Sequence, residues 1–298
     1  LSATLQEAVQ QIARERLVQE ASFHWQEPDG HSLNLFDGLH LALQKEEFYL
    51  EYQPQFDSVS GSWVGAEALM RWRHPSLGVI PPTVFIREAE AAGLIQALGQ
   101  WALRETATTW RALHELTGQT IRLAVNVSFP EIADPWYADQ VLELLAQTGM
   151  PAHYLELELT ETAMMRDASV SLLNLRRLKN AGVHIVLDDF GTGFSSLAPL
   201  SDLPLTGIKL DRAFVSPLPD HGPQSQIVGS MLDLAHRLGL ETTAEGVEDA
   251  ACLEMVRRLG CDRIQGYIYA QPLTLEELIG QAVDGFNTPK DFSQHSLF

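Results

Sequence analysis

Two aspartates stand side by side in this sequence, at Asp188 and Asp189. An apolar, β-forming run at residues 185–187 leads directly into them, and Gly191 follows closely. A buried strand that ends in two adjacent carboxylates would carry unpaired charge, which is costly to remove from water. The pair therefore predicts a cationic partner at the end of this strand.

Other polar residues recur at or just past the ends of further expected strands. They are Glu67, Asn126, Glu158, Glu161, Lys209, Glu245 and Gln265. In a barrel, such positions converge on the rim where active sites form. Several carboxylates with one amide oxygen suit Mg²⁺ or Mn²⁺ better than the softer metals that prefer Cys or His. Two such ions about 4 Å apart could activate water and hold a phosphoryl oxygen.

The elements that must position these residues are short β-rich runs alternating with longer helical patterns. The expected strands are residues 48–56, 64–72, 122–128, 155–160, 184–189, 207–210, 241–244 and 263–269. Helix-like stretches include residues 83–97, 100–116, 138–147, 170–181, 223–238 and 250–259. Eight strands with crossover helices over roughly 250 residues predict an α/β fold, the TIM (β/α)8 barrel. A doubly wound open sheet is the competing architecture.

The first two expected strands are joined by a short connection. Only residues 57–63 separate them, which is too few for a helical crossover. These two strands are therefore expected to run antiparallel. The prediction becomes a modified TIM barrel whose first strand is antiparallel.

The charge of the chain limits its partners. The net charge is −19, from 39 acidic and 20 basic residues, whereas attachment to a nucleic-acid polymer or a membrane surface calls for a basic face. We therefore expect neither partner for this fragment. An anionic substrate would also be repelled, so its site must be neutralised locally by metal ions or by Arg and Lys side chains.

Composition also predicts a location for the chain. The hydrophobic fraction of 45% provides for an ample core. The apolar stretches are too short and interrupted to span a bilayer, and the chain shows no signal peptide. Cys252 and Cys261 lack metal-ligand spacing and are interpreted as reduced thiols. We expect a cytoplasmic location, which is compatible with a full-length chain tethered to a membrane elsewhere.

Three regions are expected along the chain. Because the first residue is Leu1 and not Met, the sequence is interpreted as a piece of a longer polypeptide. Residues 1–32 are expected to form a connector helix and linker from a missing upstream domain; a helix packed across the barrel is the alternative. The barrel is expected over residues 33–283, and residues 284–298 form a polar tail.

Seven separated motifs occur in a fixed order along this chain. They are EALMRW (67–72), NVS (126–128), ELTE (158–161), DDFGTGFSSL (188–197), IKLD (208–211), EGVE (245–248) and QGY (265–267). With these motifs the chain resembles the EAL domain family, the cyclic di-GMP-specific phosphodiesterases of bacterial signalling, from about residue 33 to 280. The resemblance implies a barrel with an antiparallel first strand. It also implies hydrolysis of cyclic di-GMP to linear pGpG with two Mg²⁺ or Mn²⁺ ions.

The resemblance also implies roles for individual residues. Glu67, Asn126, Glu158 and Asp188 would bind the first metal ion, and Asp188, Asp189 and Glu245 the second. Lys209 would orient the attacking water and offset phosphate charge, and Glu245 is also a candidate general base. Gln265 would hold a water or a metal ligand.

Further residues would hold the substrate and the loop beside the metals. Arg71, Gln53, Leu69 and Asp211 are the candidates for substrate binding. Glu161 is expected to steady the loop that contains Gly191 and Thr192, which in the family couples the metal site to a dimer interface. Phe194 stands where tyrosine is common, a loss of one hydroxyl that we expect to be tolerated.

Several alternatives stay open from sequence. Asp189 could be a turn residue, Lys209 a structural ion-pair partner and Arg71 a surface-paired arginine. The whole chain could be a catalytically silent receptor module that binds cyclic di-GMP, or an unrelated lyase using Lys209. The resemblance favours the enzyme, as a homodimer joined to an upstream sensory or cyclase-like domain. Ca²⁺ is expected to inhibit it, because the larger, looser coordination of Ca²⁺ disturbs the spacing between the two ions.

Overall fold

The strand-forming runs pair side by side into one sheet that closes on itself. The computed structural model describes residues 35–160, 169–191, 202–218 and 222–286. The strands are β1 (Phe48–Asp57), β2 (Trp63–His74), β3 (Gly78–Ile80), β4 (Arg122–Asn126), β5 (Leu155–Thr160), β6 (His184–Phe190), β7 (Gly207–Leu210), β8 (Glu241–Ala244) and β9 (Arg263–Gln265). Their order is β1-β9-β8-β7-β6-β5-β4-β2, and pairing of β1 with β2 closes the barrel. The third strand, β3, extends β2 outside it.

The direction of the first strand confirms the modified barrel. Strand β1 is antiparallel to both of its neighbours, β2 and β9, and the pairs from β2 and β4 onward to β9 are parallel. In its pairing with β2, Gln53 lies opposite Glu67. The seven parallel strands bring their carboxyl ends to one rim of the barrel, where the candidate site residues are concentrated.

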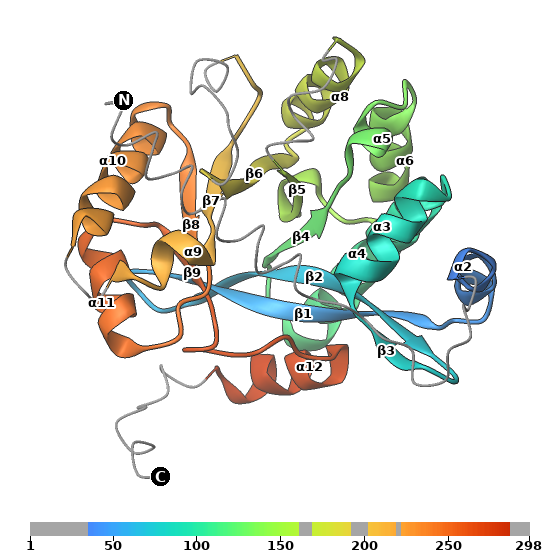
Figure 1. Ribbon diagram of the computed structural model, residues 1–298, viewed down its shortest axis with the longest axis horizontal. Helices are drawn as coiled ribbons and strands as arrows, with labels where there is room; N and C mark the ends of the chain where they lie inside the picture. The colour runs from blue at the N-terminus through green and yellow to red at the C-terminus, as the bar shows by residue number, and fades with distance from the viewer. Residues whose placement is uncertain (1–34, 161–168, 192–201, 219–221, 287–298) are drawn as a thin grey trace.

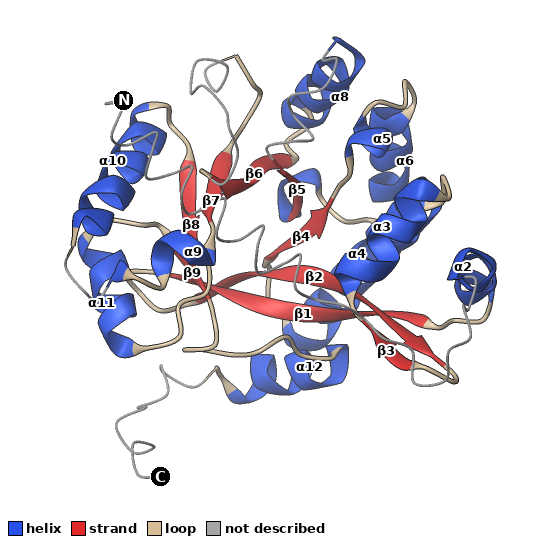
Figure 2. Ribbon diagram, in the orientation of Figure 1, coloured by secondary structure: helices blue, strands red, loops and turns tan. Residues whose placement is uncertain are grey.

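Helices surround the barrel on its outer face (Figures 1 and 2). They are α2 (Leu35–Gln44), α3 (Pro82–Ala91), α4 (Ile95–Thr117), α5 (Phe129–Ile132), α6 (Tyr137–Thr148), the 3-10 turn η1 (Ala152–Tyr154), α8 (Ser169–Asn180), α9 (Arg212–Val215), α10 (Pro223–Arg237), α11 (Ala250–Arg258) and α12 (Leu275–Asp284). In Figure 1, α2 lies at the edge of the molecule near β3, and α12 lies against β1. No helix in the described part of the chain combines the length and apolarity that crossing a membrane requires.

Alternation along the strands separates the core from the barrel interior. In β5, Leu155, Leu157 and Leu159 are fully buried and belong to the main hydrophobic core. Successive strand residues face opposite sides, so the intervening Glu156 and Glu158 point into the barrel. The apolar core therefore lies between sheet and helices, and the interior is polar.

Some expected boundaries were wrong. The helix expected at residues 83–97 is two helices, because α3 ends at Ala91 and α4 begins at Ile95 after Gly93, which has φ 69°. The last strand ends at Gln265 and does not reach residue 269. Helix α2, the short strand β3 and helix α12 were not expected. The connector expected in residues 1–32 lies outside the described residues, as does nearly all of the tail.

Candidate functional site

One buried lysine stands at the centre of the acidic cluster. Lys209 Nζ, from β7, lies 2.6 Å from Glu245 Oε1, 2.8 Å from Glu158 Oε2, 3.1 Å from Glu67 Oε2 and 3.6 Å from Asp188 Oδ1. The lysine is only 1% exposed. Four strand ends thus bring four carboxylates around one ammonium. The sequence left open that Lys209 is a structural ion-pair partner, and the structure does pair it, with four carboxylates.

Glu67 receives hydrogen bonds on both of its oxygens. Asn126 Nδ2 donates to Oε1 at 2.7 Å, while Gln265 Nε2 donates to Oε2 at 2.6 Å. Gln265 Nε2 also donates to Gln53 Oε1 at 3.1 Å. The residues proposed from the first, second, third and last expected strands therefore contact one another, and Glu158 from the fourth shares the lysine with Glu67.

The end of β6 explains how two adjacent aspartates reach one site. Asp189 has φ 56°, a left-handed value that is uncommon outside glycine but tolerated by aspartate. The register of β6 with β7 is also irregular between Leu187 and Phe190. This turn brings carboxylate oxygens of Asp188, Asp189 and Glu245 within 4.8 Å of one another. Without it, neighbouring strand residues would face opposite sides of the sheet.

Burial and mutual repulsion set the protonation of the cluster. Burial and the nearby Glu67 carboxylate raise the pKa of Glu158 well above its ordinary value, although Lys209 opposes the rise. Burial also raises the pKa of Asp188, and it raises that of Glu245 to about 8. For Glu67 burial is outweighed by Lys209 and by hydrogen bonds from Gln265 and Asn126, so its pKa is lowered.

The lysine itself stays charged despite its burial. Burial alone would lower the pKa of Lys209, but the surrounding carboxylates, Asp188 and Glu158 foremost, hold it well above its ordinary value. One ammonium is nevertheless too little for the site. Asp189 adds a fifth carboxylate to the four that surround Lys209, so full ionisation would leave four uncompensated negative charges.

The donor set fits two divalent cations. Two such ions carry four positive charges, which would balance the four negative charges left by the five carboxylates and one lysine. All the ligand atoms that these residues offer to a cation are hard oxygens. Glu158 gives a specific indication of a cation site, because its Oε1 is buried and has no hydrogen-bond partner among the described residues. A buried carboxylate oxygen without a partner is costly, and coordination of a cation would satisfy it.

Arg71 lies beside this cluster on β2 and is already paired. Its Nε donates to Glu51 Oε2 at 2.8 Å, and its Nη1 donates to the carbonyl of Met70 at 3.1 Å. Two donors of the guanidinium are thereby engaged, and its other N–H groups have no hydrogen-bond partner among the residues that the structure describes. The pairing that the sequence left open for Arg71 is therefore present, with Glu51 as the partner.

A cavity of about 670 Å³ adjoins Arg71 and one of the metal-ligand candidates, Asn126. Leu69, Arg71, Asn126 and Thr160 line it together with apolar residues from α3, the start of α4 and α5. Among the remaining candidates, Gln53 contacts Gln265, as described above. The carboxylate of Asp211 accepts from the backbone N–H of Ala213 at 2.9 Å and caps α9, which gives it a structural task as well.

The candidate loop is described only in part. Gly191 has φ 95°, and a Cβ at this position would come within 2.8 Å of the Met231 side chain and 3.0 Å of Phe214. Its positive φ therefore favours glycine, and a Cβ at this position would also require the Met231 and Phe214 side chains to shift. Glu161 and Thr192 lie outside the described residues.

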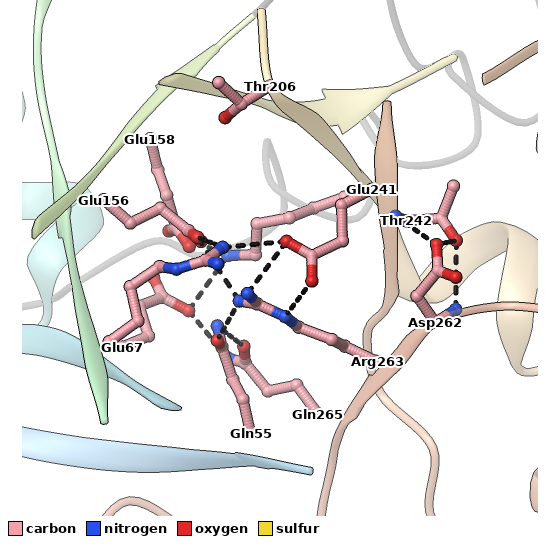
Figure 3. A network of polar contacts seen from close by, with 12 residues as sticks. Gln55, Glu67, Glu156, Glu158, Thr206, Glu241, Thr242, Asp262, Arg263 and Gln265 are labelled. Atoms are coloured by element: carbon pink, nitrogen blue, oxygen red, sulfur yellow. Dashed lines mark hydrogen bonds and ion pairs between the residues drawn. The ribbon is translucent and has the colours of Figure 1, made fainter. Parts of the chain in front are cut away.

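A second polar layer inside the barrel was missed from sequence. Arg122 Nη1 lies 2.9 Å from Glu156 Oε2 and 2.8 Å from Glu241 Oε2. Arg263 contacts the same two glutamates, with Nη1 3.3 Å from Glu156 Oε2 and Nη2 2.8 Å from Glu241 Oε2 (Figure 3). The alternation of Leu and Glu at residues 155–159 could have revealed this layer. It predicts that Glu156 points into the barrel as well as Glu158.

Known proteins resemble this chain in sequence. The EAL domain family model matches residues 37–272. The bifunctional diguanylate cyclase/cyclic di-GMP phosphodiesterase MucR of Pseudomonas aeruginosa is 38% identical over 247 residues, 83% of this chain and 36% of its own length. The cyclic di-GMP phosphodiesterase NbdA of the same organism is 38% identical over 246 residues, 83% of this chain and 31% of its own length. This chain thus spans about a third of each of these curated relatives.

Solved structures agree with the sequence relatives. The PaMucR phosphodiesterase in complex with c-di-GMP has a TM-score of 0.78 and 38% identity, covering 83% of this chain and 100% of that chain. The EAL domain of Mycobacterium smegmatis DcpA has a TM-score of 0.70 and 30% identity, covering 81% of this chain and 100% of that chain. With its family match, its antiparallel first strand and its acidic rim, this chain belongs to the EAL domain family.

Proposed function

We propose that this EAL domain is a phosphodiesterase that hydrolyses cyclic di-GMP to linear pGpG with two Mg²⁺ or Mn²⁺ ions. One observation carries the proposal. Every acidic, amide and lysine position that the family motifs call for is present, and those on the barrel rim converge around Lys209. Relatives named as cyclic di-GMP phosphodiesterases and a neighbour solved in complex with c-di-GMP support the choice of substrate.

Six residues would hold the two ions. Glu67, Asn126, Glu158 and Asp188 form one ligand set; Asp188, Asp189 and Glu245 form the other. When bound, the ions would supply Lewis acidity toward the phosphate and lower the pKa of the attacking water. The Oε1 atom of Glu158, which is buried and has no hydrogen-bond partner in the part of the chain that the structure describes, supports its place in the first set.

The chain's own cations would act on the substrate's phosphates. The guanidinium of Arg71 borders the cavity beside the cluster, and its unengaged donors suit phosphate oxygens. Leu69, Gln53 and Asp211 are the further candidates for substrate contact. Since the whole chain carries a net charge of −19, such local positive charge is needed to hold an anionic dinucleotide.

Lys209 and Glu245 would act next to the scissile phosphate. Lys209 keeps its proton, and its three N–H donors face Glu67, Glu158 and Glu245. With ions bound to those carboxylates, it would instead donate to water or to a phosphate oxygen and offset negative charge that develops there. The Glu245 carboxylate, 2.6 Å from Lys209, lies within the acidic cluster and could either bind the second ion or accept a proton from water.

Incubation with cyclic di-GMP and Mn²⁺ or Mg²⁺, followed by chromatographic separation of products, tests the proposal. We expect pGpG from the wild type and none from Glu67→Ala. Glu254→Gln removes one charge from an exposed pair with Arg258 and should leave turnover unchanged. If the wild type binds cyclic di-GMP but releases no pGpG with either ion, the chain is a receptor module and not an enzyme.

Calcium should inhibit the reaction. Ca²⁺ takes more ligands at longer distances than Mg²⁺, which would disturb the spacing between two ions held by short aspartates. Turnover measured in Mg²⁺ with increasing Ca²⁺ should fall toward zero. Robust hydrolysis with Ca²⁺ as the sole divalent ion would contradict the proposed two-ion site.

We further propose the setting in which the domain works. Residues 33–283 would form the phosphodiesterase barrel, residues 1–32 a connector and residues 284–298 a polar tail. An upstream sensory or cyclase-like domain is supported by the greater length of the curated relatives. We also propose a homodimer in the bacterial cytoplasm. Light scattering across a range of concentrations, alongside specific activity, tests the dimer and its effect on rate.

A further inference from the structure

A row of hydrogen-bonded side chains crosses the barrel interior from its second polar layer to the metal-ligand candidates (Figure 3). Arg263 Nη1 donates to Gln55 Oε1 at 3.4 Å, and Gln55 Nε2 donates to Gln265 Oε1 at 2.9 Å. Gln265 Nε2 then donates to Glu67 Oε2 at 2.6 Å. Gln55 is the link between the two layers, and neither the proposed mechanism nor the family motifs assign it a task.

The two ends of this row fix the direction of every hydrogen bond along it, because one end can only donate and the other can only accept. A guanidinium can only donate hydrogen bonds, so the oxygen of the Gln55 amide must face Arg263. The amino group of Gln55 is therefore turned toward Gln265, whose own amide must present its oxygen there. The Gln265 amino group is left to face Glu67, and a carboxylate can only accept. An amide flip anywhere along the row would set two acceptors or two donors against each other.

The surroundings hold Gln55 in this orientation. Gln55 is 1% exposed, and Arg263 is in turn anchored by Glu156 and Glu241. On the neighbouring strand β2, a Cβ at Gly65 would come within 3.0 Å of Gln55 Oε1 and within 2.9 Å of the Arg122 carbonyl. The absence of a side chain at Gly65 therefore leaves the space that the Gln55 amide occupies. With so little room, the amide has no solvent-exposed alternative.

We propose that Gln55 is a positioning residue: it locks the Gln265 amide with its amino group toward Glu67, and so orients this metal-ligand candidate. The inference rests on the proposed function, because it assigns Glu67 to a metal ion. Without the lock, the Glu67 carboxylate and Gln53 Oε1 still attract the Gln265 amino group, but the hydrogen bond that fixes the Gln265 oxygen is lost. The amide can then tilt and shift, which loosens Glu67 from the position in which Asn126 and Lys209 also hold it.

The test measures Mn²⁺ binding to the metal-free protein by calorimetry, together with kcat and KM for cyclic di-GMP. Gln55→Met keeps the length of the side chain but removes the lock, and we expect about tenfold weaker Mn²⁺ binding and a lower kcat with little change in KM. Gln55→Glu should act more strongly, since a carboxylate there draws the Gln265 amino group away from Glu67. Melting temperatures and circular dichroism establish that each variant is folded.

A double-mutant cycle separates positioning from general damage to the core. In a Gln265→Leu background, Gln55→Met should have no further effect on Mn²⁺ affinity, because the amide that Gln55 would orient is already absent. Gln100→Leu removes one half of an exposed amide pair with Gln140 and serves as the control, with unchanged Mn²⁺ affinity expected.

The outcomes distinguish this inference from the proposed function. Unchanged Mn²⁺ affinity in folded Gln55→Met, or an equal loss in the Gln265→Leu background, overturns the positioning role while the function stands. Should Gln55→Met not fold, the same comparison made with Gln55→Glu decides the matter. Wild-type protein that neither binds Mn²⁺ nor hydrolyses cyclic di-GMP overturns the proposed function and this inference with it.

Discussion

Lys209 is a permanent cation among carboxylates that cannot all ionise without further positive charge. Burial and repulsion raise the pKa values of Glu158, Asp188 and Glu245, which is the expected response of a cluster with excess negative charge. Divalent ions would reverse these shifts by favouring the charged forms. At the scale of single residues, the site is therefore built as a strong acceptor of cations.

Replacing Asp189 with Asn should reduce catalysis more than substrate binding. Asn tolerates the left-handed backbone at this position, so the turn should persist while one of the charges proposed to bind the second ion is lost. We expect kcat to fall about 100-fold, with cyclic di-GMP affinity, measured in Ca²⁺ to suppress turnover, nearly unchanged. Asp139→Asn, at an exposed pair with Arg177, is the control. Equal losses in both measurements would contradict the two-ion assignment.

Replacing Glu51 with Gln should strengthen substrate binding. The Glu51 carboxylate competes with a phosphate for Arg71, and both side chains are partly exposed. Since such a pair contributes modest energy, we expect KM to fall about two- to fivefold with kcat unchanged. Steady-state kinetics at several salt concentrations measure this, with Glu254→Gln as the charge-matched control. A higher KM would show instead that Glu51 orients Arg71 for the phosphate.

Among the elements, the short helix α5 holds the chain just after Asn126. Ser128 and Glu131 form a capping box at its start, in which Glu131 Oε2 accepts from the Ser128 backbone at 2.8 Å and from its hydroxyl at 2.6 Å. The same box occurs on the surface at α12, formed by Thr274 and Glu277. Of these two glutamates only Glu131 is buried, and their pKa values shift in opposite directions, because burial raises that of Glu131 and hydrogen bonds lower that of Glu277.

Stability should depend on pH through Glu131. Burial raises its pKa from 4.5 to about 7, so the fold prefers the protonated form. Ionisation is disfavoured in the folded state, and the free energy of unfolding should decline by up to roughly 3 kcal/mol as pH rises from about 4.5 through 7. Glu131→Gln removes this loss. Urea denaturation at pH 5 and pH 8 should therefore show the variant gaining stability relative to wild type at the higher pH.

The exposed capping box supplies the control for this pH effect. Hydrogen bonds from the Thr274 backbone and hydroxyl lower the pKa of Glu277, so this group stays ionised throughout the range from pH 5 to pH 8. Glu277→Gln should therefore change stability by the same amount at both values. A parallel response of the two variants would contradict the burial argument for Glu131.

Across the whole molecule, the barrel interior consists of stacked polar layers. One layer pairs two arginines with two glutamates, Arg122 and Arg263 with Glu156 and Glu241, and the other gathers the metal-ligand candidates around Lys209. Each of the four paired residues comes from a different strand, β4, β5, β8 or β9. The first layer therefore forms only when the sheet has closed.

Removing Glu156 should destabilise the whole barrel. Glu156→Ala leaves Arg122 and Arg263 with only Glu241 to share, and breaking a buried ion pair costs about 3–5 kcal/mol. Urea denaturation followed by circular dichroism measures the loss. Asp139→Ala breaks the exposed pair with Arg177 and should cost less than about 1 kcal/mol. Similar losses in the two variants would show that the layer contributes no more than a surface contact.

Much of the fold followed from local patterns. Short β-rich runs located all eight barrel strands, and the short segment at residues 57–63 predicted the antiparallel β1. These signals are readable because strand formation and chain reversal depend on neighbouring residues. The break between α3 and α4 was missed, since Gly93 interrupts a helical pattern that is otherwise continuous.

The sequence by itself determined which residues could bind metal, because carboxylate, amide and ammonium chemistry belongs to the side chain alone. The tertiary structure decided which of these side chains contact one another. The pairing of Arg71 with Glu51, the left-handed turn at Asp189 and the row from Arg263 through Gln55 to Gln265 all depend on register and closure. Partners in that row lie more than 200 positions apart in the chain, and only the closed sheet sets their distance and direction.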